Sequence, residues 1–234
     1  MKQILKYTYA LGLVLTLTLP FAAISGAFPF VNTAGMNLDG YVSVLVTTPA
    51  DNGEEILEGA TPPTHLFSVS MKSGELTKDD ELKKPSPFNL GVLTQSELDG
   101  APLNIILLGD RLTPGFVHRG FGIGVLRFTK GGKSQQIVLA VPKGGFAGVY
   151  NIETLKAKVP GTLEKLQAWL GSDWGASGIS IEGSRMAAIN LLGDCLQNYA
   201  YARITEADKR PMDKDGNPTL LEFPTSKNLR NFRE

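Results

Sequence analysis

The sequence predicts an α+β fold built on a small closed or partly open β-barrel with flanking helices. Three observations support this prediction. The strand signals are short, and turns of varied length rich in Gly, Pro or Asn separate them. No helical period appears among the three strand signals of residues 103–141, so these strands lack the crossover helices that a parallel α/β sheet requires. The helical periods come later, from residue 152 onward.

The expected strands have local signatures. Residues 41–48 are rich in β-branched side chains and end at Pro49. Residues 65–70 alternate apolar and polar side chains before a turn at Ser73-Gly74, as a half-buried hairpin strand does. Further strands are expected over residues 103–108, 120–128, 136–141 and 179–181.

Helices and loops are expected in the remaining segments. Leucines and Trp169 at helical spacing predict a helix over residues 152–170 that is interrupted near Pro160-Gly161. A second helix is expected over 184–201. The segments expected to be irregular or solvated are 50–64, the charged run 78–84, and 85–91 with its two prolines.

The first 27 residues have the pattern of a cleavable signal peptide. Lys2 and Lys6 precede an apolar run over 10–23, and Ser25 and Ala27 provide the small residues of a cleavage site after Ala27. The apolar run is short for a membrane span, which leaves an uncleaved anchor as the alternative. We therefore expect a secreted or periplasmic protein without a membrane span after cleavage. The expected parts are a signal peptide (1–27), a mobile lead-in (28–40), one barrel domain (41–203) and a polar C-terminal tail (204–234).

The charge balance and the cysteine content argue against some classes of partner but identify no partner. Twenty-three basic residues balance 23 acidic ones, so no overall field favours nucleic acid. Cys195 is the only cysteine, and we expect a small buried residue there because it has no partner for an internal disulfide. The ligand or protein partner stays unknown, and a homo-oligomer is left open.

The strongest motif signal lies in residues 98–142. Asp99-Gly100-Ala101-Pro102-Leu103-Asn104 opens a strand, and the turn Pro114-Gly115 follows. Gly124-Val125-Leu126 and Ala140-Val141-Pro142 then mark two strands. In this order the motifs resemble those of the soluble family I inorganic pyrophosphatases, with weaker matches over 41–192. The resemblance implies an OB-like barrel and Mg²⁺-dependent hydrolysis of diphosphate, in which carboxylates hold the metal ions and Lys, Arg and Tyr bind the phosphates.

The resemblance implies one retained catalytic and metal-binding residue, Asp99. Ala101 and Asn104 replace the other two acids of the family motif D-G-D-P-x-D, and Lys130 and Gln135 stand at two metal-binding Asp positions of the family's acidic loop. Apolar residues stand where the family has a Tyr, a Lys and a second Tyr: Leu90, Ile137 and Leu170. We therefore expect no cofactor, or Mg²⁺ if the site has been rebuilt.

A basic turn offers a separate candidate site. Arg127, Lys130 and Lys133 surround Gly131-Gly132, and such a group attracts anions such as phosphate or diphosphate. A solvated hairpin tip is the alternative interpretation.

Three functions fit the sequence. The first is an exported pyrophosphatase-family protein that has lost catalysis and acts as a binding or scaffold module. The second is a Mg²⁺-dependent inorganic pyrophosphatase with a rebuilt site that contains Asp99. The third is a phosphate- or anion-binding module that uses Arg127, Lys130 and Lys133.

Overall fold

The computed structural model describes residues 29–37, 39–51, 64–82 and 84–208. The expected signal peptide and most of the expected C-terminal tail lie outside these residues. The elements follow in the order α1 (Pro29–Asn32), β1 (Val42–Thr48), β2 (His65–Val69), β3 (Leu76–Glu81), β4 (Asn89–Leu93), β5 (Asn104–Leu107), β6 (Val117–Lys130), β7 (Lys133–Pro142), α2 (Ile152–Lys158), α3 (Thr162–Ser172), β8 (Ser177–Glu182) and α4 (Arg185–Asp208).

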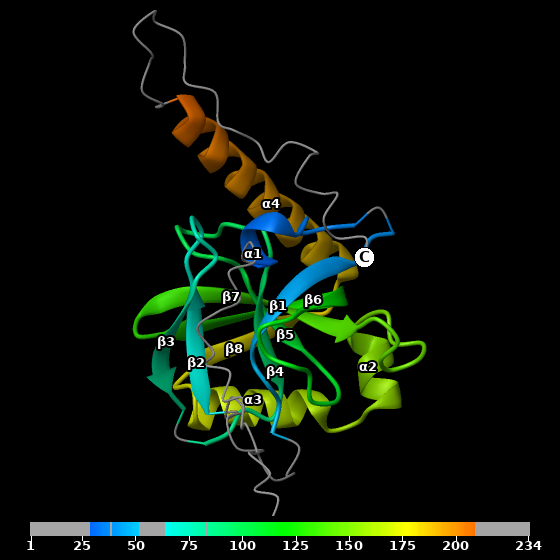
Figure 1. Cartoon of the computed structure of the whole chain (residues 1–234). Coiled ribbons are helices and arrows are strands. Elements are labelled where there is room, and N and C mark those ends of the chain that lie inside the picture. The colour runs from blue at the N-terminus through cyan, green and yellow to red at the C-terminus, as the bar shows by residue number, and fades with distance from the viewer. Residues whose placement is uncertain (1–28, 38, 52–63, 83, 209–234) are drawn as a thin grey trace, which may run out of the picture.

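Six strands form one sheet that closes on itself (Figure 1). The strand order is β1-β4-β5-β7-β6-β8, and β1 also pairs with β6, so the first five strands form a ring. All ring pairings are antiparallel except that of β5 with β7. Closure leaves no free edge in the ring, and it confirms the predicted barrel with flanking helices.

The long strand β6 takes part in both the ring and its extension. Its first residues pair with β1, and its last residues pair with β8. Between these halves the register with β7 shifts from Gly122 to Gly124, which is a bulge. A Cβ on Gly124 would lie 2.8 Å from Ile152 Cγ1 and 2.9 Å from the Glu182 carbonyl oxygen, so only glycine allows α2 and β8 to approach this closely.

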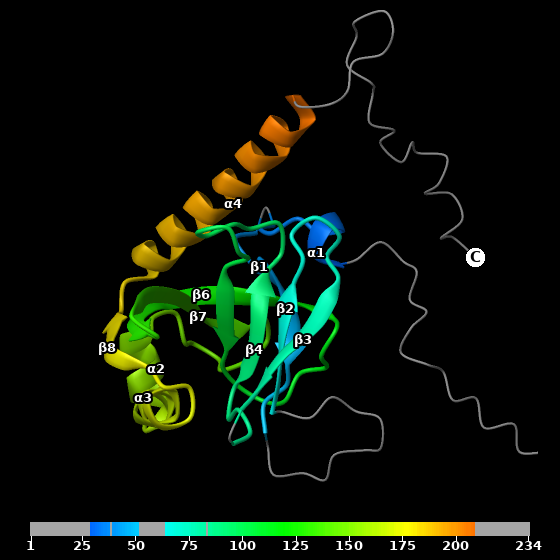
Figure 2. The same ribbon diagram turned by 90° about the vertical axis from the view of Figure 1, so that its left-hand side faces the viewer.

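Apolar side chains form two large clusters. The barrel core takes side chains from all five ring strands and from α4: Val42, Val44, Val46, Leu93, Leu103, Ile105, Leu107, Val125, Val138, Ala140, Ala188, Leu192 and Cys195. The outer core lies between the barrel and the helices α2 and α3. It includes Phe88, Leu90, Ile106, Phe128, Ile137, Leu139, Leu166, Trp169 and Leu170. Figure 2 shows α2 and α3 on one side of the barrel, away from the hairpin of β2 and β3.

Helix α4 covers the barrel with its first half and extends beyond it with its second half (Figures 1 and 2). Tyr199 meets Phe30 of α1 edge to face, with ring centroids 5.9 Å apart. Tyr201 and Ile204 are 59% and 58% exposed. No helix among the described residues is both long enough and apolar enough to cross a membrane.

The structure differs from the expected elements in three places. The segment 85–91, expected to be irregular, leads into β4, whose five residues are all buried. The charged run 78–84, expected to be a loop, largely forms β3, which pairs with β2. The lead-in expected to be mobile contains α1 and buries Phe30 completely. The expected helix interruption is confirmed, because α2 ends at Lys158 and α3 begins at Thr162.

Candidate functional site

Asp99 lies in a two-residue β-turn. Leu98 and Ala101 exchange two backbone hydrogen bonds of 2.7 and 3.0 Å, and the φ angles of Asp99 and Gly100 are 52° and 82°. Positive φ at both central residues defines a type I′ turn, which favours the dipeptide Asp-Gly. The turn therefore gives Asp99 a structural role in the backbone.

The surroundings of Asp99 belong to the barrel core and α4. Leu98 packs against the barrel core. Burial raises the pKa of the Cys195 thiol to about 11, and the negative charges of Asp194 and Asp99 act in the same direction. Asp99 is exposed, so its carboxylate faces solvent next to α4.

The three basic residues of the predicted anion site lie on the hairpin of β6 and β7, and they do not converge. Arg127 forms an ion pair with Glu182 of β8, and its Nε donates to Gln136 Oε1 at 3.4 Å. Lys130 lies over Trp174, with Nζ 5.2 Å from the ring centroid, and it is the register partner of Lys133. Residues three apart on a strand point to opposite faces, so Arg127 points away from Lys130 and Lys133.

The three apolar residues that the motif resemblance aligns with phosphate-binding side chains are buried in the outer core. Leu90, Ile137 and Leu170 are 6%, 2% and 0% exposed, and they belong to the same cluster as Phe88 and Trp169. Helix α3 covers this face of the barrel with an apolar stripe that includes Trp169 and Leu170. Trp174 follows α3 and packs against Trp169, with ring centroids 5.3 Å apart and tilted planes. The face is therefore filled by packed apolar side chains.

The residues that the motif resemblance aligns with metal-binding acids do not fit Mg²⁺. This ion prefers several carboxylate and water oxygens in octahedral geometry. The chain presents one carboxylate, Asp99, with an alanine, an amide and a lysine at Ala101, Asn104 and Lys130. Within the described residues, no three His, Cys, Asp or Glu side chains come together in a way that could hold a metal ion.

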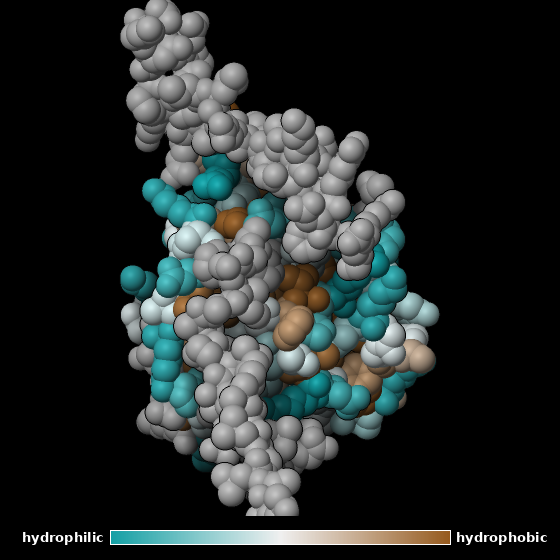
Figure 3. All heavy atoms as spheres, in the orientation of Figure 1, coloured by the Kyte–Doolittle hydropathy of each residue, from teal (hydrophilic) through white to brown (hydrophobic). Residues whose placement is uncertain are grey.

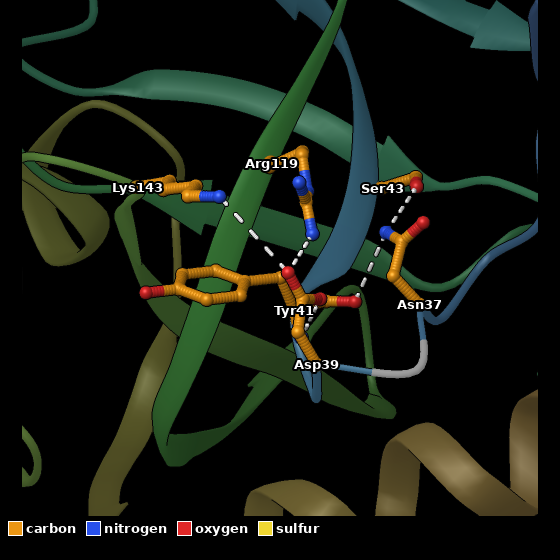
Figure 4. Close-up of polar contacts among 6 residues, drawn as sticks. All are labelled: Asn37, Asp39, Tyr41, Ser43, Arg119 and Lys143. Carbon is orange, nitrogen blue, oxygen red and sulfur yellow. Dashed lines mark hydrogen bonds and ion pairs between the residues drawn. The ribbon is translucent and has the colours of Figure 1, made fainter.

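A different group of polar side chains lies where β1, β6 and the end of β7 meet (Figure 4). Asp39, just before β1, forms an ion pair with Arg119 of β6, and Lys143 Nζ lies 4.0 Å from the same carboxylate. The ring of Tyr41 lies beneath both cations, 5.3 Å from Arg119 Cζ and 5.2 Å from Lys143 Nζ. Asn37 supports the loop by donating to the Tyr41 carbonyl and to Ser43 Oγ, each at 3.3 Å.

The electrostatics of this group are dominated by its cations. The hydrogen bond from Arg119 holds the pKa of the Asp39 carboxyl below its ordinary value, and the charge of Lys143 acts in the same direction. A third cation, Arg185 at the start of α4, stacks on Phe121 with Cζ 4.2 Å from the ring centroid. Two cations therefore share the Asp39 carboxylate, and a third lies over the neighbouring Phe121 ring.

A cavity of about 170 Å³ opens beside these residues. We call it the Tyr41 pocket. Its lining residues are Tyr41, Phe121, Val141, Pro142, Lys143, Gly144, Gly145, Phe146, Gly148, Val149 and Tyr150. In Figure 3, hydrophobic side chains are visible amid hydrophilic ones near the centre of the face that Figure 1 presents, over the region of β1 and β6. This pocket could not be predicted from the sequence, because its walls come from three separate segments. The one local signal that could have indicated its position is the glycine-rich run after Pro142, which is typical of a turn.

Comparisons with known proteins find similarity in structure alone. Neither a protein-family model nor a curated protein sequence matches the chain significantly. The type I inorganic pyrophosphatase of P. falciparum superposes with a TM-score of 0.63 at 15% identity, over 81% of this chain and 70% of that one. Inorganic pyrophosphatases of Helicobacter pylori (TM-score 0.55, 19% identity, 68% of this chain and 94% of that one) and Neisseria gonorrhoeae (0.56, 18%, 71% and 96%) superpose similarly. The chain thus has the inorganic pyrophosphatase fold.

Proposed function

We propose that this chain is an exported member of the inorganic pyrophosphatase family that no longer hydrolyses diphosphate and acts as a binding or scaffold module. Family membership is supported by the shared fold together with the order of the motifs at Asp99-Gly100, Pro114-Gly115 and Ala140-Val141-Pro142. Export is supported by the leader pattern that ends at Ala27.

The loss of catalysis is supported above all by one observation: Leu90, Ile137 and Leu170 are packed into the outer core. Hydrolysis of diphosphate needs a hydrated, charged pocket, in which cations neutralise the charge that develops on the phosphoryl oxygens. A buried leucine or isoleucine offers neither hydrogen bonds nor charge, and a desolvated polyanion beside it would be strongly destabilised.

The role of Asp99 also favours a non-catalytic protein. Its positive φ and its Asp-Gly turn give this residue a structural reason to be retained. A single exposed carboxylate binds Mg²⁺ weakly, because the ion gives up its hydration water reluctantly.

The test is a hydrolysis assay on the purified chain after removal of residues 1–27. The chain is incubated with diphosphate and Mg²⁺, and released phosphate is measured with the Helicobacter pylori enzyme as a parallel positive control. We expect no more than trace release. Sustained turnover that disappears in Asp99→Ala would overturn the proposal and support the Mg²⁺-dependent alternative.

A second measurement addresses the anion-binding alternative. Calorimetric titration with phosphate and diphosphate is compared between the natural chain and the triple variant Arg127→Gln, Lys130→Gln, Lys133→Gln. Because Arg127 is paired with Glu182 and points away from the two lysines, we expect no binding that depends on these three residues. Tight binding that the triple variant abolishes would favour the anion-binding module.

A further inference from the structure

The Tyr41 pocket combines aromatic walls with a cationic rim. Four of its lining side chains are aromatic: Tyr41, Phe121, Phe146 and Tyr150. Tyr41 and Phe121 contact each other with ring centroids 6.2 Å apart and tilted planes, which leaves part of both rings turned to the cavity. Tyr150 also lines the cavity and is 60% exposed. Such walls suit a planar ring, which can stack on one aromatic face and meet the edge of another.

The cations at this pocket exceed what its one carboxylate can neutralise. Arg119 and Lys143 share Asp39, whereas Arg185 lies over the face of Phe121. Arg119 also has a buried Nε without a hydrogen-bond acceptor among the described residues. The group therefore has capacity left for an anion.

Lys143 is the side chain best placed to contact a ligand. It lines the cavity, its side chain is 49% exposed, and its Nζ lies at 4.0 Å from Asp39, the outer limit of an ion pair. A pair this long and this exposed contributes little, so Lys143 can turn from Asp39 to a bound anion at small cost. Arg119, which is held by Asp39, keeps the positive field in place.

The glycine-rich turn after β7 forms part of the pocket wall. Gly144 and Gly148 have φ angles of 84° and 74°, which side chains rarely adopt. A Cβ on Gly148 would also lie 2.3 Å from Lys158 Nζ, which in turn donates to the Ala147 carbonyl at 2.8 Å. The turn is thus tied to α2 through Lys158.

The size of the cavity limits the ligand. At about 170 Å³ it is smaller than the roughly 300–1,000 Å³ of pockets that enclose drug-sized molecules. It holds one ring with a compact substituent, and it excludes a dinucleotide.

We propose that the Tyr41 pocket binds a small acid with a single aromatic ring, an aryl phosphate or aryl carboxylate, whose ring lies between Tyr41 and Tyr150 and whose anionic group meets Lys143 and Arg119. This inference deepens the proposed binding role by giving it a site and a ligand class. The pocket is not lined by Leu90, Ile137 or Leu170, although two of its lining residues, Val141 and Val149, belong to the same outer core.

Two probes and two half-probes test the ligand class. Phenyl phosphate and benzoate are titrated into the ¹⁵N-labelled chain, and amide shifts are followed at Tyr41, Phe121, Lys143 and Tyr150. Inorganic phosphate and phenol each carry only half of the recognised chemistry. We expect saturable shifts with a dissociation constant of about 1 mM or tighter for at least one full probe, the scale for a ligand of roughly ten heavy atoms. Both half-probes should bind at least about tenfold more weakly.

Matched variants locate the site. Lys143→Gln and Tyr150→Ser should each weaken binding about tenfold or more, because they remove a charge-assisted contact and a stacking surface. Lys78→Gln and Tyr201→Ser remove an exposed lysine and an exposed tyrosine elsewhere, and they should change binding less than about twofold. Circular dichroism spectra and melting curves identify any variant that fails to fold. If Lys143→Gln is among these, Lys143→Met takes its place.

Three results would overturn the inference. The first is the absence of amide shifts at these residues at a probe concentration of about 10 mM, roughly ten times the expected dissociation constant. The others are binding of inorganic phosphate as tight as that of phenyl phosphate, and an equal loss of affinity in the pocket and control variants. The hydrolysis assay stays a separate readout. Release of phosphate from diphosphate would refute the proposed loss of catalysis and would leave the inference about the pocket standing. The absence of both hydrolysis and probe binding would refute only the inference about the pocket.

Discussion

Asp39 and Arg119 form an ion pair that joins the loop before β1 to the first half of β6, 80 residues further along the chain. The two elements pair as neighbouring strands at the point where the ring closes. The ion pair therefore lies over the closure of the barrel and at the edge of the Tyr41 pocket.

The ion pair predicts an acid titration that Arg119 controls. Because the hydrogen bond from Arg119 is the largest cause that lowers the pKa of Asp39, we expect its carboxyl to titrate below the ordinary value of 3.8. Arg119→Gln should move the titration up toward that value, and Lys143→Gln should move it less. Carbon-detected NMR of the Asp39 carboxyl measures both shifts. Equal shifts in the two variants would contradict the assigned order of causes.

The sign of the linked stability follows from the direction of that shift. A carboxyl with a lowered pKa in the folded state stabilises the fold at pH values above its ordinary pKa. This contribution fades as the pH falls through the lowered pKa. Asp39→Asn should remove this part of the pH dependence, which urea unfolding at pH 2.5–7 measures; an unchanged profile would show that the pair does not couple to folding.

The turn at Asp99 predicts how substitutions there act. Asp99→Asn and Asp99→Gly should leave the melting temperature nearly unchanged, because Asn and Gly tolerate the left-handed backbone at φ 52°. Asp99→Val should lower stability by about 1–2 kcal/mol, because a β-branched residue is strained there. Differential scanning calorimetry compares the three. If Asn, which keeps the shape but removes the charge, destabilised as much as Val, the carboxylate would have a role beyond the turn.

Local turn chemistry explains why much of the barrel could be predicted. Asp99-Gly100 and Gly131-Gly132 have the positive φ angles that their residue types favour, so the strands between them could be found from short windows. The strand β4 could not. Its two preceding prolines suggested an irregular segment, but Asn89 fixes the strand through contacts from distant parts of the chain. Its Oδ1 accepts from the Ala50 and Leu112 amides at 2.9 and 2.8 Å.

The residues of the candidate site could be predicted from the sequence only where they occupy positions of a recognisable motif. Leu90 and Ile137 could be identified as apolar replacements in the sequence, but their meeting in one cluster with Leu170 depends on how α3 packs on the barrel. The Tyr41 pocket was missed, because Tyr41, Arg119 and Lys143 come from separate segments with no shared spacing. Periodicity describes single elements, and it carries no information about side chains that meet between them.

Burial of Cys195 predicts that its thiol reacts slowly with alkylating reagents. Its pKa of about 11, raised from 9.0 mainly by burial, lowers the thiolate fraction at pH 8 about 100-fold relative to the unfolded chain. Iodoacetamide should therefore label the folded chain at least about 100-fold more slowly than the chain in urea. Mass spectrometry measures both rates, and Cys195→Ser provides the blank. Similar rates in both states would mean that α4 separates readily from the barrel core.

The apolar face predicts the result of restoring a family side chain. Ile137 is 2% exposed in the outer core, so Ile137→Lys buries an unpaired ammonium and should lower the free energy of unfolding by about 3–5 kcal/mol. Ile137→Met keeps the volume and the apolar character, and it should cost less than about 1.5 kcal/mol. Urea unfolding followed by Trp169 and Trp174 fluorescence compares the two variants. The contrary result would be near-natural stability of Ile137→Lys together with new release of phosphate from diphosphate. It would mean that water and substrate reach this face of the barrel. The apolar packing would then not be the reason for the expected lack of diphosphate hydrolysis.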